Sequence, residues 1–97
     1  MKIYIAGAIT GYTPEQFHAK FEECRDRVAL KYPQAQIIIP TDLCPDDMGW
    51  ADCMKICLNE LKSCNLIYMM KDWKESKGAT AEHIVAEILD IAIEYDE

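Results

Sequence analysis

The stretch LIYMMKDWKESKGATAE, residues 66–82, decides the fold. Its first five residues are apolar without alternation, which is typical of a strand covered on both faces. A polar segment follows, and beyond it apolar residues recur at the spacing of one helical face. The predicted inner face of this helix consists of Ala81, Ile84, Val85 and Ile88. A buried strand, a polar loop and a helix that runs to about residue 89 are therefore expected in that order.

The rest of the chain repeats this alternation of strand and helix. Strands are predicted at 3–6 and 36–39, a third at 65–70 at the start of the quoted stretch, and a last, edge-type strand at 91–95. Strands separated by helices favour right-handed crossovers, a parallel sheet and helices on both of its faces. The sequence thus predicts one α/β domain over residues 1–97, a three-layer sandwich with a mostly parallel four-stranded sheet.

Two helices are expected before the focal stretch. The first begins after Thr13, where Thr13, Pro14 and Gln16 form a capping pattern, and it ends near residue 32. Its predicted buried face comprises Phe17, Phe21, Cys24 and Val28. The second helix is predicted from residue 50 to about 62. Its predicted inner face comprises Met54, Leu58 and Leu61. Residues 41–49, rich in Pro and Asp, are expected to form a loop between the second strand and this helix.

Composition excludes some classes of partner. The formal net charge of −7 argues against binding to duplex DNA, which requires Lys and Arg to neutralise phosphates. A small anion is still allowed, because local backbone N–H groups can bind one against the global field. No segment approaches the ~20 apolar residues of a membrane span, and no secretory signal is visible. We therefore expect neither a nucleic-acid polymer nor a membrane as partner.

The cysteines favour a reduced protein. Their number is odd and their spacing is unlike that of a disulfide scaffold, which favours a reduced, cytoplasmic chain. Cys53 and Cys57 are four apart on a predicted helix, with Cys64 just beyond, and such spacing brings two thiolates to one face, as a zinc site requires. No CxxC pair or neighbouring His accompanies them. The prediction is buried thiols, with no metal and no cofactor.

The expected ligand site lies at the carboxyl ends of the strands, where parallel sheets bind ligands at a switch in strand order. The loops after the first and third strands both end there, so residues 7–11 are predicted beside residues 76–82. Ser76 and Gly78 offer a hydroxyl and an unobstructed backbone to an anion, next to the free N–H groups of a helix's first turn. Glu82 follows about one turn later.

Two motifs carry a family resemblance. KIYIAGAITG at residues 2–11 and WKESKGATAE at residues 73–82 resemble the nucleoside 2-deoxyribosyltransferase superfamily, and within it the domains of unknown function called DUF4406. The resemblance covers nearly the whole chain in order. It implies a flavodoxin- or Rossmann-like fold, chemistry at the N-glycosidic bond of a nucleoside or nucleotide, and a homo-dimer or higher homo-oligomer.

The resemblance also implies roles for individual residues. Glu82 stands where related deoxynucleotide N-hydrolases have the carboxylate that attacks the anomeric carbon, and Tyr4 where a tyrosine supports it. Ser76 and Gly78 match the residues that bind a 5′-phosphate. The turn after the first strand, Gly7, Ala8, Ile9, Thr10 and Gly11, would add backbone N–H groups. Trp73 would either form a wall for the base or pack against its own loop.

Three positions depart from the family pattern. Cys57 stands where relatives carry an Asp that helps the departing base, and a thiol cannot replace a carboxylate that accepts two hydrogen bonds at neutral pH. Asn65 replaces an Asp, and Thr10 replaces an Arg. The carboxylates of Asp42, Asp46, Asp47 and Asp72 are candidates to substitute for the missing Asp.

These departures leave alternatives open. Glu82 is a nucleophile or complements a helix dipole, Ser76 is a phosphate ligand or a helix cap, and Tyr4 is a site residue or a core aromatic. The first function hypothesis is therefore N-glycosidic cleavage or deoxyribosyl transfer through Glu82. The alternatives are a non-catalytic module that binds a nucleotide or phosphorylated sugar, and an interaction protein with a vestigial site.

Overall fold

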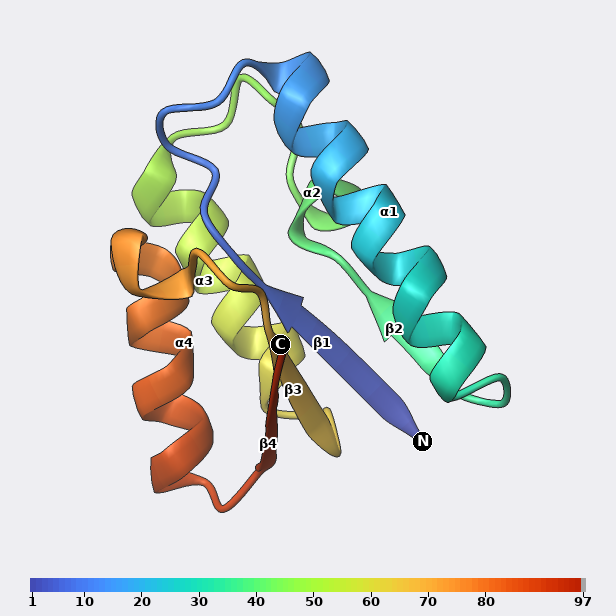
Figure 1. The fold of residues 1–97 in the computed structure, drawn as a ribbon. Helices are drawn as coiled ribbons and strands as arrows, with labels where there is room; N and C mark the ends of the chain where they lie inside the picture. The colour runs from blue at the N-terminus through green and yellow to red at the C-terminus, as the bar shows by residue number, and fades with distance from the viewer. Residues whose placement is uncertain (97) are drawn as a thin grey trace.

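Four strands and their connecting helices alternate along the chain. The structure is a computed structural model and describes residues 1–96. Its elements are β1 (Lys2–Ala6), α1 (Pro14–Lys31), β2 (Gln36–Ile38), α2 (Pro40–Leu43), α3 (Trp50–Leu61), β3 (Leu66–Met69), the 3-10 helix η1 (Trp73–Glu75), α4 (Lys77–Ile88) and β4 (Ala92–Tyr95) (Figure 1). The predicted alternation of strands and helices is confirmed.

The sheet has the strand order β2-β1-β3-β4, and every neighbouring pair is parallel. The predicted four-stranded sheet is therefore confirmed and is parallel throughout, with β4 at an edge as expected. The chain moves outward from β1 to β2 and then returns to the other side of β1 with β3. This reversal creates a switch point between β1 and β3, which is where open parallel sheets bind ligands.

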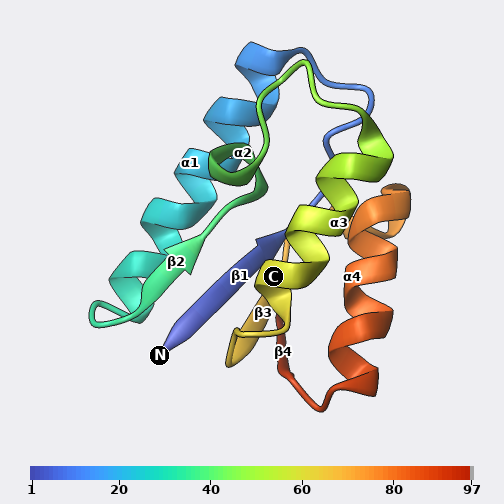
Figure 2. The same ribbon diagram turned by 180° about the vertical axis from the view of Figure 1, so that it is seen from behind.

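Helices cover both faces of the sheet, as predicted. In β1, Ile3 and Ile5 pack with Phe21 of α1 in one buried cluster. Tyr4 and Ala6 face the opposite side and join the cluster under α3 and α4. Figure 2 shows α3 and α4 side by side on that face, with α1 across the sheet. Because side chains alternate along a strand, the register of β1 aims Tyr4 at the two helices that border the switch point.

Local sequence accounts for the first helix. The hydroxyl of Thr13 accepts a hydrogen bond from the N–H of Gln16 at 3.2 Å, and the Gln16 side chain accepts one from the N–H of Thr13 at 2.9 Å. This reciprocal pair satisfies two N–H groups that a helix start leaves free. Phe21 and Val28 are buried, so the predicted apolar face is confirmed.

Two local predictions are wrong in the segment 39–49. Residue 39 does not extend β2, and residues 40–43 form the short helix α2 instead of a loop. Pro40 occupies the first helical position, where its fixed φ suits a helix and its missing N–H costs nothing. The turn carries Cys44 back against α3, where it forms a disulfide with Cys53. The expectation of five reduced cysteines is therefore wrong for this pair, whereas Cys24, Cys57 and Cys64 are free and buried as predicted.

The predicted inner face of α4 is wrong for Ile84 and Ile88, whereas Val85 is partly buried against the core as expected. Ile84 is 51% exposed and Ile88 is 72% exposed, whereas Ala79, Glu82 and Ala86 are buried. The apolar spacing identified a helix correctly but included the two large residues Ile84 and Ile88 in its inner face. Small residues allow α4 to lie close to the sheet, and this close packing brings the Glu82 carboxyl group inside the domain. Within residues 1–96, none of the helices combines the length and apolar composition needed to cross a membrane.

Candidate functional site

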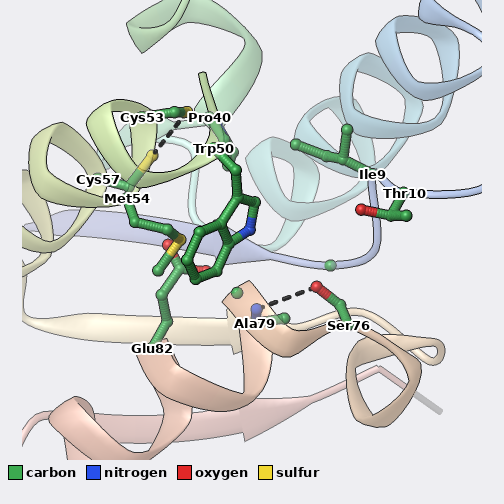
Figure 3. Close-up of a pocket in the computed structure, with 12 residues that line it drawn as sticks. Ile9, Thr10, Pro40, Trp50, Cys53, Met54, Cys57, Ser76, Ala79 and Glu82 are labelled. Atoms are coloured by element: carbon green, nitrogen blue, oxygen red, sulfur yellow. Dashed lines mark hydrogen bonds between the residues drawn. The ribbon is translucent and has the colours of Figure 1, made fainter. Parts of the chain in front are cut away.

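A cavity of about 120 Å³ opens at the switch point between β1 and β3. Its walls come from the loop after β1, the start of α2, and the first turns of α3 and α4 (Figure 3). The lining residues are Gly7, Ile9, Thr10, Pro40, Trp50, Cys53, Met54, Cys57, Ser76, Gly78, Ala79 and Glu82. The predicted proximity of the loops after the first and third strands is thus confirmed.

Glu82 supplies the carboxyl group of the cavity. Its side chain is only 4% exposed, and its Oε2 accepts a hydrogen bond from the hydroxyl of Tyr4, which lies in the buried centre of β1. Burial raises the pKa of Glu82 from about 4.5 to about 7, although the hydrogen bond from Tyr4 opposes that rise. The carboxyl group therefore changes its charge near neutral pH, in contact with the cavity.

Tyr4 links Glu82 to a thiol. Burial raises the pKa of Tyr4 well above 10, and the charge of Glu82 raises it further, so the phenol stays protonated and can donate. Burial likewise raises the pKa of Cys57 to about 11, while a hydrogen bond with Tyr4 lowers it. Cys57 is therefore a neutral thiol at pH 7. Position 57, where relatives are expected to carry an Asp, therefore contributes no negative charge to the cavity.

The amino end of α4 forms the polar side of the cavity. Ser76 is the N-cap of the helix, and its hydroxyl accepts a hydrogen bond from the N–H of Ala79 at 3.1 Å. Thr10 and Ser76 lie on the side opposite Cys53 and Cys57, with the ring of Trp50 between them (Figure 3). Ser76 thus acts as a helix cap and also lines the cavity, so both predicted roles are compatible with the structure.

Gly78 lets α3 and α4 approach each other at the cavity. A Cβ atom on Gly78 would lie 3.0 Å from the sulfur of Met54 and 3.7 Å from the indole nitrogen of Trp50. The Lys77 ammonium group lies 4.8 Å from the centre of the Trp50 ring. This cation–π contact joins the first turns of the two helices. Glycine at position 78 therefore keeps the floor of the cavity open between Met54 and the start of α4.

Asp72 fixes the two loops of the site to each other. Its carboxylate accepts hydrogen bonds from the N–H of Ala8 at 3.1 Å and the hydroxyl of Tyr12 at 3.1 Å, and it pairs with Lys20 at 2.9 Å. Burial would raise the pKa of Asp72, but the bonds from Lys20 and Ala8 outweigh it and hold the pKa below its usual value. Asp72 is thus an ionised clamp rather than a cavity residue.

Some predicted site residues do not line the cavity. The N–H of Ala8 is already bonded to Asp72, and Gly11 lies outside the lining, where its φ of 95° serves the turn. Trp73 stacks on His83 of α4 with ring centres 4.3 Å apart and does not line the cavity, and this contact lies outside the loop against which it was predicted to pack. The cavity wall is formed by Trp50, which the sequence pattern marked only as the start of a helix.

Alternative carboxylates are also absent from the lining that the structure describes. Asp42 pairs with Arg25 and Asp46 with His18 at exposed positions, and Asp72 is held by Lys20. Asn65 accepts a hydrogen bond from the N–H of Lys2 at the opposite end of the sheet. Within residues 1–96, Glu82 is thus the one carboxylate among the lining residues, and none of the expected substitutes joins it.

Comparison with known proteins places this architecture in a family. A family model described as "Domain of unknown function (DUF4406)" matches residues 1–95. The chain belongs to the DUF4406 family. A comparison of this DUF4406 chain with curated proteins gave no match.

The fold of the DUF4406 domain is shared with a solved enzyme structure. The 2-desoxiribosyltransferase from Leishmania mexicana superposes with a TM-score of 0.71 at 20% sequence identity. The match covers 97% of this chain and 62% of that protein, so the DUF4406 domain spans somewhat less than two thirds of its length. At this identity the match establishes a common fold. The deoxyribosyltransferase-like, flavodoxin-type architecture expected from the two sequence motifs is therefore confirmed.

Proposed function

We propose that this domain binds a nucleoside or nucleotide in the cavity and cleaves its N-glycosidic bond with Glu82 as the nucleophile. The observation that carries the proposal is a buried carboxyl group that faces the cavity, accepts a hydrogen bond from Tyr4 and has a pKa of about 7. Burying an ionisable group is unfavourable for folding, and perturbed carboxyl groups in cavities concentrate at functional sites. The deoxyribosyltransferase-like fold supports the same reaction class.

The chemistry needs one ionised carboxylate. As the N-glycosidic bond breaks, its electron pair leaves with the base and positive charge builds on the anomeric carbon. A Glu82 oxygen bonds to that carbon and forms a glycosyl ester, while the base takes a proton from water. Water then cleaves the ester and regenerates the Glu82 carboxylate, or a second base attacks in its place and the sugar is transferred.

The cavity divides into regions that suit the parts of a nucleotide. Its volume of about 120 Å³ is below the ~300–1,000 Å³ of sites that enclose drug-sized ligands, so it would enclose a fragment such as the sugar. The Trp50 ring is half exposed and offers a flat face to a base. Thr10, Ser76 and the amino end of α4 offer hydrogen bonds and a favourable dipole to a phosphate group.

The test is release of free base. Purified protein is incubated with a panel of 2′-deoxynucleosides and their 5′-monophosphates, and free base is quantified by chromatography. We expect at least one substrate to be cleaved, and Glu82→Gln to lower the rate by roughly 100-fold or more. Glu87→Gln is the matched control, because Glu87 lies on the same helix but is exposed. Equal rates for wild type and Glu82→Gln would contradict the proposal.

The pH profile tests the role of Tyr4. Only ionised Glu82 can attack, so the rate should rise with pH through about 7, the pKa of the buried carboxyl group. The Tyr4 hydrogen bond stabilises the carboxylate and lowers that pKa. Tyr4→Phe should therefore move the midpoint of the profile to higher pH, in addition to any fall in the maximal rate. An unchanged midpoint would show that Tyr4 does not act on Glu82.

A second candidate function is non-catalytic binding of a nucleotide or phosphorylated sugar. The observation that favours it is the leaving-group side, where a neutral Cys57 stands and no second carboxylate lines the cavity within residues 1–96. Under this alternative, deoxynucleoside monophosphates would raise the melting temperature without release of base. Ser76→Ala should reduce that shift, whereas the same substitution at Ser63, which lies beyond α3, should leave it unchanged.

A further inference from the structure

Three cysteine sulfurs converge at the edge of the cavity. Cys44 ends α2, while Cys53 and Cys57 lie on successive turns of α3. The Cys57 sulfur is 3.9 Å from that of Cys44 and 3.8 Å from that of Cys53, and all three lie within 4.8 Å of one another. Cys44 and Cys53 are joined as a disulfide. Figure 3 shows Cys53 and Cys57 on the α3 side of the cavity.

The position of Cys57 argues against a simple thiol relay. Thiol–disulfide exchange requires the attacking sulfur to approach along the axis of the bond that it breaks. Cys57 is almost equally far from both sulfurs of the disulfide, so it lies beside that bond and not on its axis. The three sulfurs therefore form a triangle rather than a line, and a triangle of sulfurs is a face that a metal ion can occupy.

We propose that Cys44, Cys53 and Cys57, once the disulfide is reduced, bind a soft divalent cation such as Zn²⁺. Zinc–sulfur bonds of ~2.3 Å in tetrahedral geometry hold sulfurs about 3.8 Å apart. Both separations from Cys57 already have that value, so only the sulfurs of Cys44 and Cys53 have to move apart. Three thiolates of this kind are the ligand set that soft metals prefer.

The stoichiometry of the step is simple. A dithiol reductant gives two electrons and two protons to the Cys44–Cys53 bond and becomes a disulfide itself. Binding of Zn²⁺ then displaces one proton from each of the three thiols to solvent, and three zinc–sulfur bonds form. The disulfide and the metal are thus mutually exclusive states of one site.

The fourth coordination position would be open toward the cavity. Cys53 and Cys57 line the cavity itself, while Cys44 and Cys53 line a smaller hollow beside it. Thr41 also lines that hollow, and its hydroxyl is buried without a hydrogen-bond partner among the described residues. Three protein ligands and one open position are typical of zinc sites that bind water or a substrate group. The metal would therefore sit where a ligand of the cavity could reach it.

The test uses Co²⁺ as a spectroscopic probe for the zinc site. The full-length protein is reduced with a dithiol, desalted without oxygen and titrated with Co²⁺. We expect one equivalent to produce the thiolate charge-transfer band and the visible bands of a tetrahedral site, and Zn²⁺ to abolish both. Protein that is not reduced should give neither band. Absence of the bands after reduction, or equal bands without reduction, would overturn the proposal.

Cysteine variants assign the ligands. Removal of a group that only hydrogen-bonds to a metal ligand weakens metal binding ~10–100-fold. Cys57→Ser and Cys44→Ser each remove a ligand itself, so each should weaken Co²⁺ binding by at least that factor. Cys64→Ser is the matched control, because Cys64 is a free, buried cysteine beyond α3 and outside the triangle. Cys44 is only partly buried, so a serine at this position is easier to accommodate in the fold. If Cys57→Ser fails to fold, Cys44→Ser still tests the assignment. Equal affinities for Cys44→Ser, Cys64→Ser and wild type would refute the assignment.

Discussion

At the scale of the residue, Glu82 carries an ionisable group into a region where its ionised form is unfavourable. Tyr4 belongs to a core cluster that otherwise consists of apolar side chains and thiols, and its hydroxyl donates a hydrogen bond to the Glu82 carboxyl group. A glutamine or an apolar residue would fill the same place without the electrostatic cost. The retention of a carboxyl group there is what makes position 82 a candidate for chemistry and not for packing.

This cost leads to an expectation about stability. The folded protein holds the Glu82 proton up to about pH 7, whereas the unfolded chain releases it near 4.5. Folding is therefore penalised as pH rises from about 4.5 to about 7, and the full penalty of roughly 3 kcal/mol applies above pH 7. Glu82→Gln removes the ionisation and should be more stable than wild type at pH 8, by an amount that shrinks toward zero below pH 4.5.

Urea denaturation of both proteins at pH 4 and pH 8 measures this difference. Other titrating groups contribute equally to the two proteins and cancel in the comparison. A variant that is stabilised at pH 8 and inactive would show that position 82 trades stability for function. A difference that does not depend on pH would contradict the raised pKa of Glu82.

At the scale of the element, the site depends on two loops and a helix end being held in register. Backbone hydrogen bonds of η1 order the loop after β3 internally, and a side chain joins this loop to the loop after β1. Asp72 joins the loop after β3 to the N–H of Ala8 and to Lys20 of α1. β1 and β3 pair only as far as Ala6 and Met69, and the two loops begin directly after these residues. The hydrogen bond from Ala8 to Asp72 therefore holds the loops together beyond the end of the sheet.

Removal of the clamp should loosen the site and the fold together. Asp72→Ala leaves the N–H of Ala8 and the Lys20 ammonium group without this partner, which should cost about 1–3 kcal/mol in the free energy of unfolding. The contribution of Asp72 to wild-type stability is present at neutral pH and is lost as pH falls through its lowered pKa. Denaturation at pH 7 measures the loss.

Asp46→Ala is the control for the clamp. Asp46 also forms an ion pair, with His18, but at an exposed position. Its removal should change stability by no more than about 0.5 kcal/mol. Equal effects of the two substitutions would mean that Asp72 is an ordinary surface carboxylate.

At the scale of the whole molecule, topology places the site and leaves one apolar surface exposed. The switch point between β1 and β3 brings together segments that are about 70 residues apart, and the cavity forms there. On the far side of α4, Ile84, Ile88 and Leu89 are exposed next to a hollow shared with α3. An apolar surface of this kind on a small domain is where a second copy would add burial.

The homo-oligomer remains a prediction, and this surface is where it can be tested. Ile88→Lys should convert a homo-dimer to a monomer, because it places a charge in the middle of the apolar surface. Leu30→Lys is the matched control, since Leu30 is 86% exposed on α1 at the other face of the sheet. Light scattering coupled to size-exclusion chromatography measures the mass. A monomeric wild type, or a dimer that survives Ile88→Lys, would contradict the prediction.

The sequence by itself determined the order of the four strands and the three long helices, the parallel sheet and the neighbourhood of Glu82, Ser76 and Gly78. These features follow from local signals: unbroken apolar runs, the capping residues at Thr13 and Ser76, and crossover helices between strands. Such signals act between residues that are close in the chain, so they can be read without coordinates.

Only the tertiary structure decided which faces turn inward and which distant side chains meet. Helical spacing does not say whether large or small residues face the sheet. Close packing turned Ala79 and Glu82 of α4 toward the core, while Ile84 and Ile88 of the same helix stayed exposed. The cavity wall at Trp50, the clamp at Asp72 and the three-sulfur triangle likewise join residues from separate elements. These arrangements depend on how helices pack across the sheet, which is a property of the assembled core and not of any single segment.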